Sequence, residues 1–210
     1  MAARVELRNG RQVFGDRDKT INVGSQKSWH TSLVSKTLRL VVLGLALAAA
    51  SAFALAVVGG AWWSIAGVEV GPHGSQHCMG GADFCGLEWL GAGYDWQRLG
   101  TTVWGTGLVA ALVLLILAAT VAAKRGPRLL GIVAITSSLT TAVIGTLFVV
   151  RFPGFPSAHL DRGIWLFAIG VFFGLAAGLA VVRSATLTAK AAHHAAARNL
   201  AAAKRAAESA

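Results

Sequence analysis

The stretch GIWLFAIGVFFGLAAGLAVV, residues 163–182, contains no charged side chain over its twenty residues. The hydrocarbon core of a bilayer is crossed by about 20 predominantly apolar residues in a helix. Three further uncharged runs of this kind lie earlier in the chain, at residues 40–63, 101–123 and 129–150. The sequence therefore predicts an all-α membrane protein, a four-transmembrane-helix bundle.

The composition of the whole chain supports lipid as its main solvent. Of the 210 residues, 55% are hydrophobic and only 13% are charged, whereas soluble domains contain about 25% charged residues. The first apolar run follows 39 residues of polar chain, and it is longer than the roughly 7–15 apolar residues of a signal peptide. We expect it to be a retained transmembrane span.

Three segments follow from this pattern. Residues 1–39 form a polar, basic leader, in which the Asn-Gly pair within 5–14 predicts a possible hairpin; a disordered leader is the alternative. Residues 40–183 form the membrane domain, with a first external loop at 64–100. The tail, 184–210, is rich in alanine, which predicts that the fourth helix continues into it.

The distribution of the basic residues predicts the orientation. If both termini are cytoplasmic, 16 Lys and Arg face the cytoplasm and only Arg98, Arg151 and Arg162 face outward, as the positive-inside rule requires. The net charge of +10 is thus explained without nucleic acid as a partner, since no aromatic and basic platform accompanies it. The composition, rich in Ala, Gly and Arg, indicates a bacterial protein of the inner (cytoplasmic) membrane.

The two cysteines, Cys78 and Cys85, lie in the loop 64–100, which also holds four acidic residues and one basic residue. An external loop is an oxidising environment, and a disulfide closing so short a loop contributes about 2–3 kcal/mol. We expect a structural disulfide that staples the loop. There are two alternatives, a redox centre and a metal site that recruits His73 and His77. The Cys-x-x-Cys spacing that is typical of redox catalysts is absent.

The four apolar runs contain no ionisable residue. All six histidines lie outside them, which disfavours haem or pigment binding, and proton or ion pathways normally place ionisable groups inside the membrane. The polar candidates are hydroxyls in the third run, which more often bond to backbone than conduct ions: Ser137, Ser138, Thr140 and Thr141. The sequence predicts no catalytic residue, no cofactor, no metal and no enzymatic activity.

The fourth run has glycines at a strict interval of four residues, Gly170, Gly174 and Gly178, so they share one helix face. Close backbone approach at such a face favours helix packing, either within the chain or with another subunit. Trp89 and Trp96 are candidates for an external contact surface, with a small local core as the alternative. The remaining tryptophans near the ends of the runs predict an interfacial belt: Trp62, Trp63, Trp104 and Trp165.

This layout resembles the claudin-like tetraspan membrane proteins. Trp62 or Trp63 corresponds to the leading Trp of the first external loop in that family, and Cys78 and Cys85 correspond to its cysteine pair. The Gly-Leu-x-Trp stretch, residues 86–89, follows the cysteines here, whereas in the family it precedes them. The resemblance implies a scaffold or adhesion role with the external loop as the contact surface.

Together these observations predict a non-enzymatic accessory or assembly subunit of a larger membrane protein complex. Its partners would be the lipid bilayer and other membrane protein subunits or copies of itself. A self-associating claudin-like tetraspan that acts in adhesion or barrier formation is the first alternative. An envelope thiol-disulfide oxidoreductase that uses Cys78 and Cys85 is the second.

Overall fold

The computed structural model describes residues 22–65, 68–75, 94–124, 128–155 and 157–208, and for 22–35 only the helical backbone. The chain divides into two units, Met1–Leu38 and Arg39–Ala210, and the packing described below is that of the second unit. The hairpin predicted at 5–14 lies outside the described residues.

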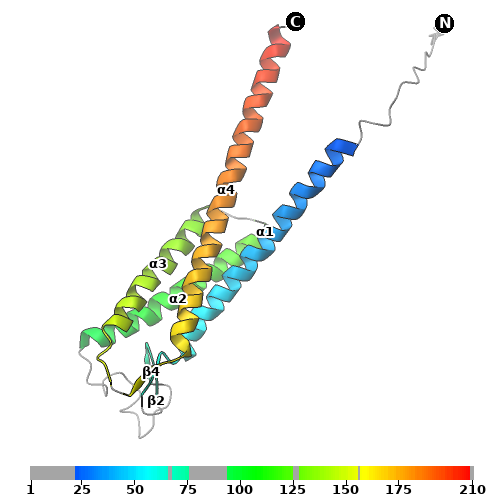
Figure 1. Cartoon of the computed structure of the whole chain (residues 1–210). Coiled ribbons are helices and arrows are strands. Elements are labelled where there is room, and N and C mark those ends of the chain that lie inside the picture. The colour runs from blue at the N-terminus through cyan, green and yellow to red at the C-terminus, as the bar shows by residue number, and fades with distance from the viewer. Residues whose placement is uncertain (1–21, 66–67, 76–93, 125–127, 156, 209–210) are drawn as a thin grey trace, which may run out of the picture. The chain divides into compact units, whose positions relative to one another are not determined.

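Four long helices dominate the fold (Figure 1). They are α1 (Asn22–Ala54), α2 (Tyr94–Ala122), α3 (Arg128–Val150) and α4 (Arg162–Glu208). Each contains a segment that is long and apolar enough to cross a membrane. The prediction of a helical protein is confirmed, and its four long helices have the length and composition that a membrane span requires.

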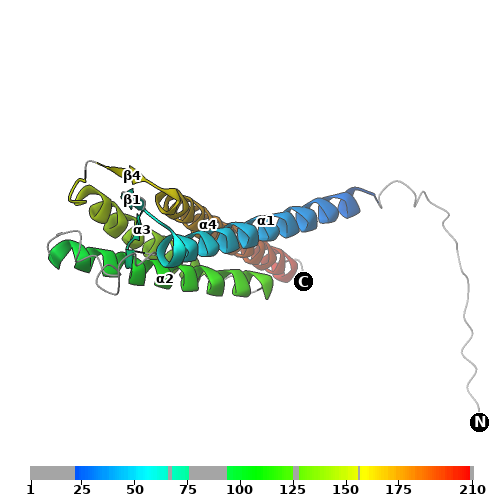
Figure 2. The same cartoon turned by 90° about the horizontal axis from the view of Figure 1, so that it is seen from below.

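A small antiparallel sheet lies at one end of the helices, which we call the sheet end (Figures 1 and 2). Its strands, β1 (Trp63–Ile65), β2 (Val68–Gly71), β3 (Gly74–Ser75) and β4 (Ala158–Leu160), are arranged in the order β3-β2-β1-β4. Strand β1 pairs with β4 in a register that places Trp63 opposite Leu160. The sheet therefore joins the segment after the first span to the segment before the last.

The end of the first predicted span requires a correction. The run 40–63 was expected to be helical throughout, but α1 ends at Ala54 and continues as a short π-helix, η1 (Leu55–Gly59). The backbone of Gly60 is extended, and Trp63 already belongs to β1. Hydropathy alone does not distinguish the end of a membrane helix from the strand that follows it, because a buried strand is as apolar as a membrane helix.

The other helices differ from the predicted runs mainly at their polar ends. α2 begins at Tyr94, before the run 101–123, and α3 coincides with the run 129–150 except for one added residue, Arg128. α4 begins one residue before the predicted run and continues through the alanine-rich tail to Glu208. Within 1–39, the leader segment, α1 is already helical from Asn22.

Local signals explain where these helices begin and end. Lys124, two residues after the end of α2, has a left-handed backbone, φ 58°, which is a common way to stop a helix. At the start of α4 the carboxylate of Asp161 accepts a hydrogen bond from the Arg162 amide at 2.6 Å, so that an acidic side chain satisfies one of the amides that lack a helical partner.

Candidate functional site

The sheet end is held by an aromatic cluster, which we define as Phe53, Trp62, Trp63, Trp96, Phe148, Phe152 and Phe167. Trp62 is fully buried at its centre. Its ring lies 4.9 Å from that of Phe167 and 5.7 Å from that of Phe148, centroid to centroid. Such pairs stabilise by roughly 0.5–1.5 kcal/mol each beyond area burial, so the cluster ties four segments of the chain together, one from each long helix or its end.

The backbone around Trp62 is fixed by hydrogen bonds as well as by packing. Its amide donates to the Val70 carbonyl at 2.8 Å, and its carbonyl accepts from the Asp161 amide at 3.0 Å. The indole Nε1–H donates to the Ala56 carbonyl in η1 at 2.8 Å. Buried polar groups need such partners, and here one residue connects the π-helix, the sheet and the start of α4.

Trp96 belongs to the same cluster, and this corrects its expected role as an external contact surface. Only 5% of the residue is exposed. Its ring stacks on Phe148 at 4.6 Å, and its indole Nε1–H donates to the Phe148 carbonyl at 3.0 Å. Phe148 lies in the last turn of α3, where carbonyls lack helical partners, so Trp96 caps α3 from α2. The local core that the sequence left open as an alternative is the one observed.

A sequence signal for the burial of Trp96 existed. It begins a regular series of buried residues on α2 that repeats every three and four positions: Trp96, Gly100, Val103, Gly107, Ala110, Leu114, Leu117 and Val121. That spacing marks one face of a helix. The series starts inside 64–100, the segment predicted to be the external loop, so the apolar run 101–123 alone does not reveal it.

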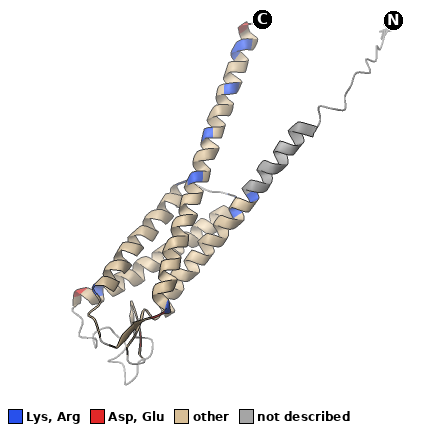
Figure 3. Ribbon diagram, viewed as in Figure 1, with Lys and Arg blue, Asp and Glu red and all other residues tan. Residues whose placement is uncertain are grey.

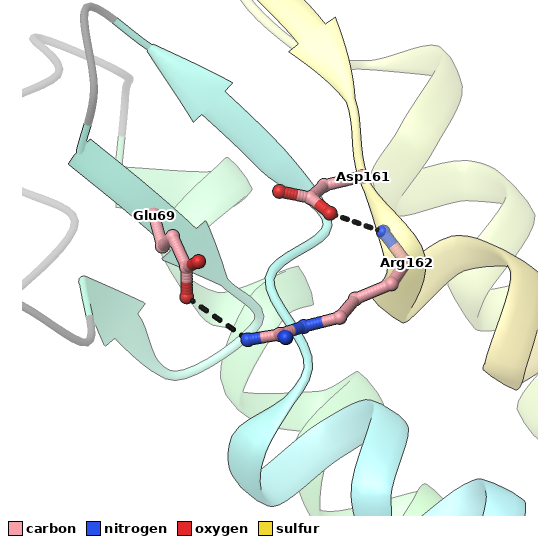
Figure 4. A network of polar contacts seen from close by, with 3 residues as sticks. All are labelled: Glu69, Asp161 and Arg162. Carbon is pink, nitrogen blue, oxygen red and sulfur yellow. Dashed lines mark hydrogen bonds and ion pairs between the residues drawn. The ribbon is translucent and has the colours of Figure 1, made fainter.

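An ion pair connects the start of α4 to β2 at the surface of the sheet end (Figure 4). The guanidinium of Arg162 lies 3.4 Å from the carboxylate of Glu69 on β2, and both side chains are partly exposed. Exposed pairs contribute only about 0–1 kcal/mol. Figure 4 also shows the Asp161 carboxylate on the Arg162 amide, so the two acids hold the same residue by its side chain and by its backbone.

The three glycines of α4 are buried against helices of the same chain. A Cβ at Gly170 would meet the ring of Phe53 at 3.0 Å, and one at Gly174 would meet Ser138 Oγ at 2.5 Å. At Gly178 it would meet the Gly131 carbonyl oxygen at 2.9 Å. The structure thus places α1 and α3, rather than a second subunit, against this face.

Two of the predicted hydroxyl groups in the third span donate to backbone carbonyls. Ser137 Oγ donates to the Ala134 carbonyl of its own helix at 3.1 Å. Thr141 Oγ1 donates across to the Thr106 carbonyl on α2, also at 3.1 Å. Ser138 Oγ, which is buried against Gly174, has no hydrogen-bond partner among the described residues. These groups serve helix packing, as expected for hydroxyls in a membrane bundle.

The last part of α4 is different from every other described segment of the second unit. All residues from 186 to 208 are exposed, and within 183–208, which we call the extension, lie five Lys and Arg but a single acid, Glu208. Figure 3 shows the Lys and Arg positions as separate bands along this part of α4, while the middle of the helices is free of them. The extension is therefore a charged helix that is exposed to its surroundings from residue 186 onward.

The remaining predicted residues have mixed outcomes. Cys78, Cys85 and Trp89 lie outside the described residues, so the disulfide and the external surface at Trp89 stay predictions. Of the expected interfacial belt, Trp62 and Trp63 are buried in the aromatic cluster, because the chain turns into the sheet there. Trp165 is 65% exposed at the start of α4, and Trp104 is half-buried beside His73, with ring centroids 5.0 Å apart.

No protein-family model and no curated protein sequence matches this chain.

Proposed function

We propose that this protein is a non-enzymatic accessory or assembly subunit of a larger complex in the bacterial inner membrane. In this proposal both termini are cytoplasmic, so the sheet end faces outward and the extension of α4 projects into the cytoplasm. The positive-inside distribution of Lys and Arg supports this orientation.

The observation that carries the proposal is the contrast within α4. Its first part is packed by buried glycines against neighbouring helices, whereas its last 23 described residues, 186–208, form an exposed helix. An isolated helix is only marginally stable in water. A long exposed helix that continues directly from a membrane span is well suited to contact another protein.

The packing of the bundle supports the same function. The buried side chains of the described spans are apolar apart from Ser138 and Thr141, and the hydroxyl of Thr141 is engaged by the Thr106 carbonyl. Such an interior suits a rigid support. The stapled loop predicted at Cys78 and Cys85 adds a second contact surface on the outer side.

The test is a native mass determination on protein extracted from its own membrane in mild detergent, with each co-migrating chain identified. Unrelated subunits at fixed stoichiometry are the expected result. A ladder of identical copies would replace the proposal with the self-associating tetraspan, and a lone monomer would contradict both.

The thiol oxidoreductase alternative is tested separately with a Cys78→Ser/Cys85→Ser double variant. We expect the variant to lose stability and to retain its co-migrating subunits. Loss of a thiol-disulfide exchange activity, measured with a dithiol substrate in membrane vesicles, would overturn the non-enzymatic assignment.

A further inference from the structure

The basic residues of the α4 extension lie on one side of the helix. At 3.6 residues per turn they fall within an arc of about 140°. We call this side the basic face and define it by Arg183, Lys190, His193, His194, Arg198, Lys204 and Arg205. The opposite side is formed almost entirely by alanine, serine, threonine and asparagine. The charge is therefore directional, unlike that of a uniformly solvated helix.

Little within the extension offsets this charge. Its one acid, Glu208, pairs with Lys204 at 3.9 Å, and both side chains are largely exposed. Arg198 Nε donates to the His194 carbonyl of its own helix at 3.4 Å, which leaves its positive charge unneutralised. The basic face thus presents a row of exposed cations to the surroundings.

The spacing of the row indicates the shape of the partner. Arg183, Lys190, Arg198 and Arg205 follow one another at intervals of 7, 8 and 7 residues, which is about 11 Å, or two turns, per step. Two packed helices return to the same mutual register about every seven residues. A partner helix with acidic residues at that interval would meet one cation at every second turn.

We propose that the basic face docks an acidic helix of a partner subunit, whose Asp or Glu residues recur at intervals of about seven. The proposal rests on the accessory-subunit function and adds to it which surface binds and the chemistry of what it binds. The alanines between the cations, such as Ala197 and Ala201, are short. The two helix axes can therefore approach closely, since side-chain size at the contact sets the interaxial distance.

Other occupants fit the basic face less well. A second copy would bring cations against cations, with only Glu208 to offset them. Anionic lipid acts over a Debye length of about 8 Å, whereas the 25 residues after Arg183 extend about 38 Å along the helix axis. Duplex nucleic acid carries about one charge per 1.7 Å, far denser than the row of cations.

The experiment places a photoreactive amino acid at one of two alanines of the full chain and irradiates intact native membranes. Ala201 lies in the middle of the basic face, and Ala203 lies on the opposite side of the helix. Both are exposed, and both sites carry the same side chain, so each serves as the matched control of the other. We expect an adduct from Ala201, attached to a helical peptide of another subunit with acids at heptad spacing, and little from Ala203.

Charge is tested in the same preparation with a Lys190→Gln/Arg198→Gln/Arg205→Gln variant. Glutamine is a good helix former, so the helix is retained while three charges are lost. Exposed ion pairs are individually weak, and we expect the loss of three together to lower the Ala201 adduct roughly tenfold. The control variant, Lys36→Gln/Arg39→Gln/Arg128→Gln, removes three exposed cations elsewhere and should leave the adduct unchanged.

Any of several results would overturn the inference: adducts of equal yield from both faces, no adduct, or an adduct to lipid, nucleic acid or a second copy. An unaltered yield in the charge variant would do the same. If the wild-type protein still co-migrates with foreign subunits while the Ala201 adduct fails, the accessory function stands and only the docking surface is wrong. If the wild type migrates alone, the accessory function itself has failed.

Discussion

The two halves of α4 are one continuous helix, yet they are maintained by different interactions. Between residues 163 and 182 the helix is packed against its neighbours, with Gly163, Gly170, Gly174 and Gly178 all buried. From 186 to 208 it is exposed on every side. The first half therefore depends on tertiary contacts, and the second depends on the intrinsic preferences of its residues.

The sequence of each half reflects this difference. Glycine costs about 1 kcal/mol relative to alanine inside a helix, so four glycines in the packed half are tolerated only because neighbouring atoms occupy the space of a side chain. The exposed half has no such contacts and consists largely of alanine, the best helix former. Substitutions in the two halves should accordingly disturb different properties, which the following four predictions test.

The largest effect is expected at the sheet end, where the packed half begins. Replacement of Trp62 by Ala removes a fully buried ring and its hydrogen bond to the Ala56 carbonyl. Removal of a buried aromatic costs about 3–5 kcal/mol, measured as the free energy of unfolding in an SDS titration of the detergent-solubilised protein. The matched control is Trp165→Ala, because Trp165 is 65% exposed; equal losses for both variants would contradict the described core.

Among the buried glycines of α4, the Gly174→Ala change should lower the free energy of unfolding by about 1–3 kcal/mol, as overpacking does. The new Cβ would lie 2.5 Å from Ser138 Oγ, but 3.4 Å from Leu114 and 3.5 Å from the Ser138 Cβ, both ordinary contacts. Ser138→Ala should therefore restore most of the lost stability in the double variant. Gly105→Ala, where nothing lies within 4 Å, provides the control, and a strictly additive double variant would show that the clash is not the cause.

A smaller loss of stability is expected when the hydrogen bond between α3 and α2 is removed. Thr141→Val keeps the shape of the side chain and removes the donor to the Thr106 carbonyl. Such bonds in membrane proteins average about 0.6 kcal/mol and reach about 1.7 kcal/mol. Thr146→Val is the comparison, since Thr146 is exposed and donates only within its own helix; it should be near neutral in the same unfolding titration.

The smallest effect on the bundle is expected from the exposed half of α4. Ala196→Gly should lower local helix stability by about 1 kcal/mol and leave the unfolding midpoint of the bundle unchanged. Hydrogen exchange measured residue by residue distinguishes local loosening of the extension from destabilisation of the bundle, and we expect faster exchange only in the extension. A shift of the bundle midpoint comparable to that of Gly174→Ala would mean that the extension packs on the rest of the chain.

The helices were predictable from the sequence because a bilayer requires about 20 consecutive apolar residues in each spanning helix. A pattern of that length does not depend on any single residue. The sheet was not predictable. Its strands have two to four residues, too few for alternation to be recognised. One of them, β4, follows a connection that contains Pro153 and Pro156.

The site was predicted unevenly for a related reason. The interval of Gly170, Gly174 and Gly178 identified a packed face, but the sequence did not specify whether an internal helix or a second subunit covers it. Trp62, Trp63 and Trp96 were assigned from hydropathy and loop position to a belt and a contact surface. Their burial depends on the pairing of β1 with β4 and on the stacking against Phe148, which are contacts between distant parts of the chain.

The pairing of β1 with β4 also bears on how the protein is made. Trp63 is synthesised early and pairs with Leu160, which precedes the last helix. At about 5–20 residues per second, the ribosome needs roughly 5–20 s to deliver β4 after β1. During that interval the backbone of Trp62 lacks its bond to Asp161, so a nascent chain that stalls before β4 exposes an unpaired strand edge. Completion of the sheet thus reports that the chain has been synthesised through α3 to the start of α4, and quality-control proteases should recognise chains truncated before residue 158.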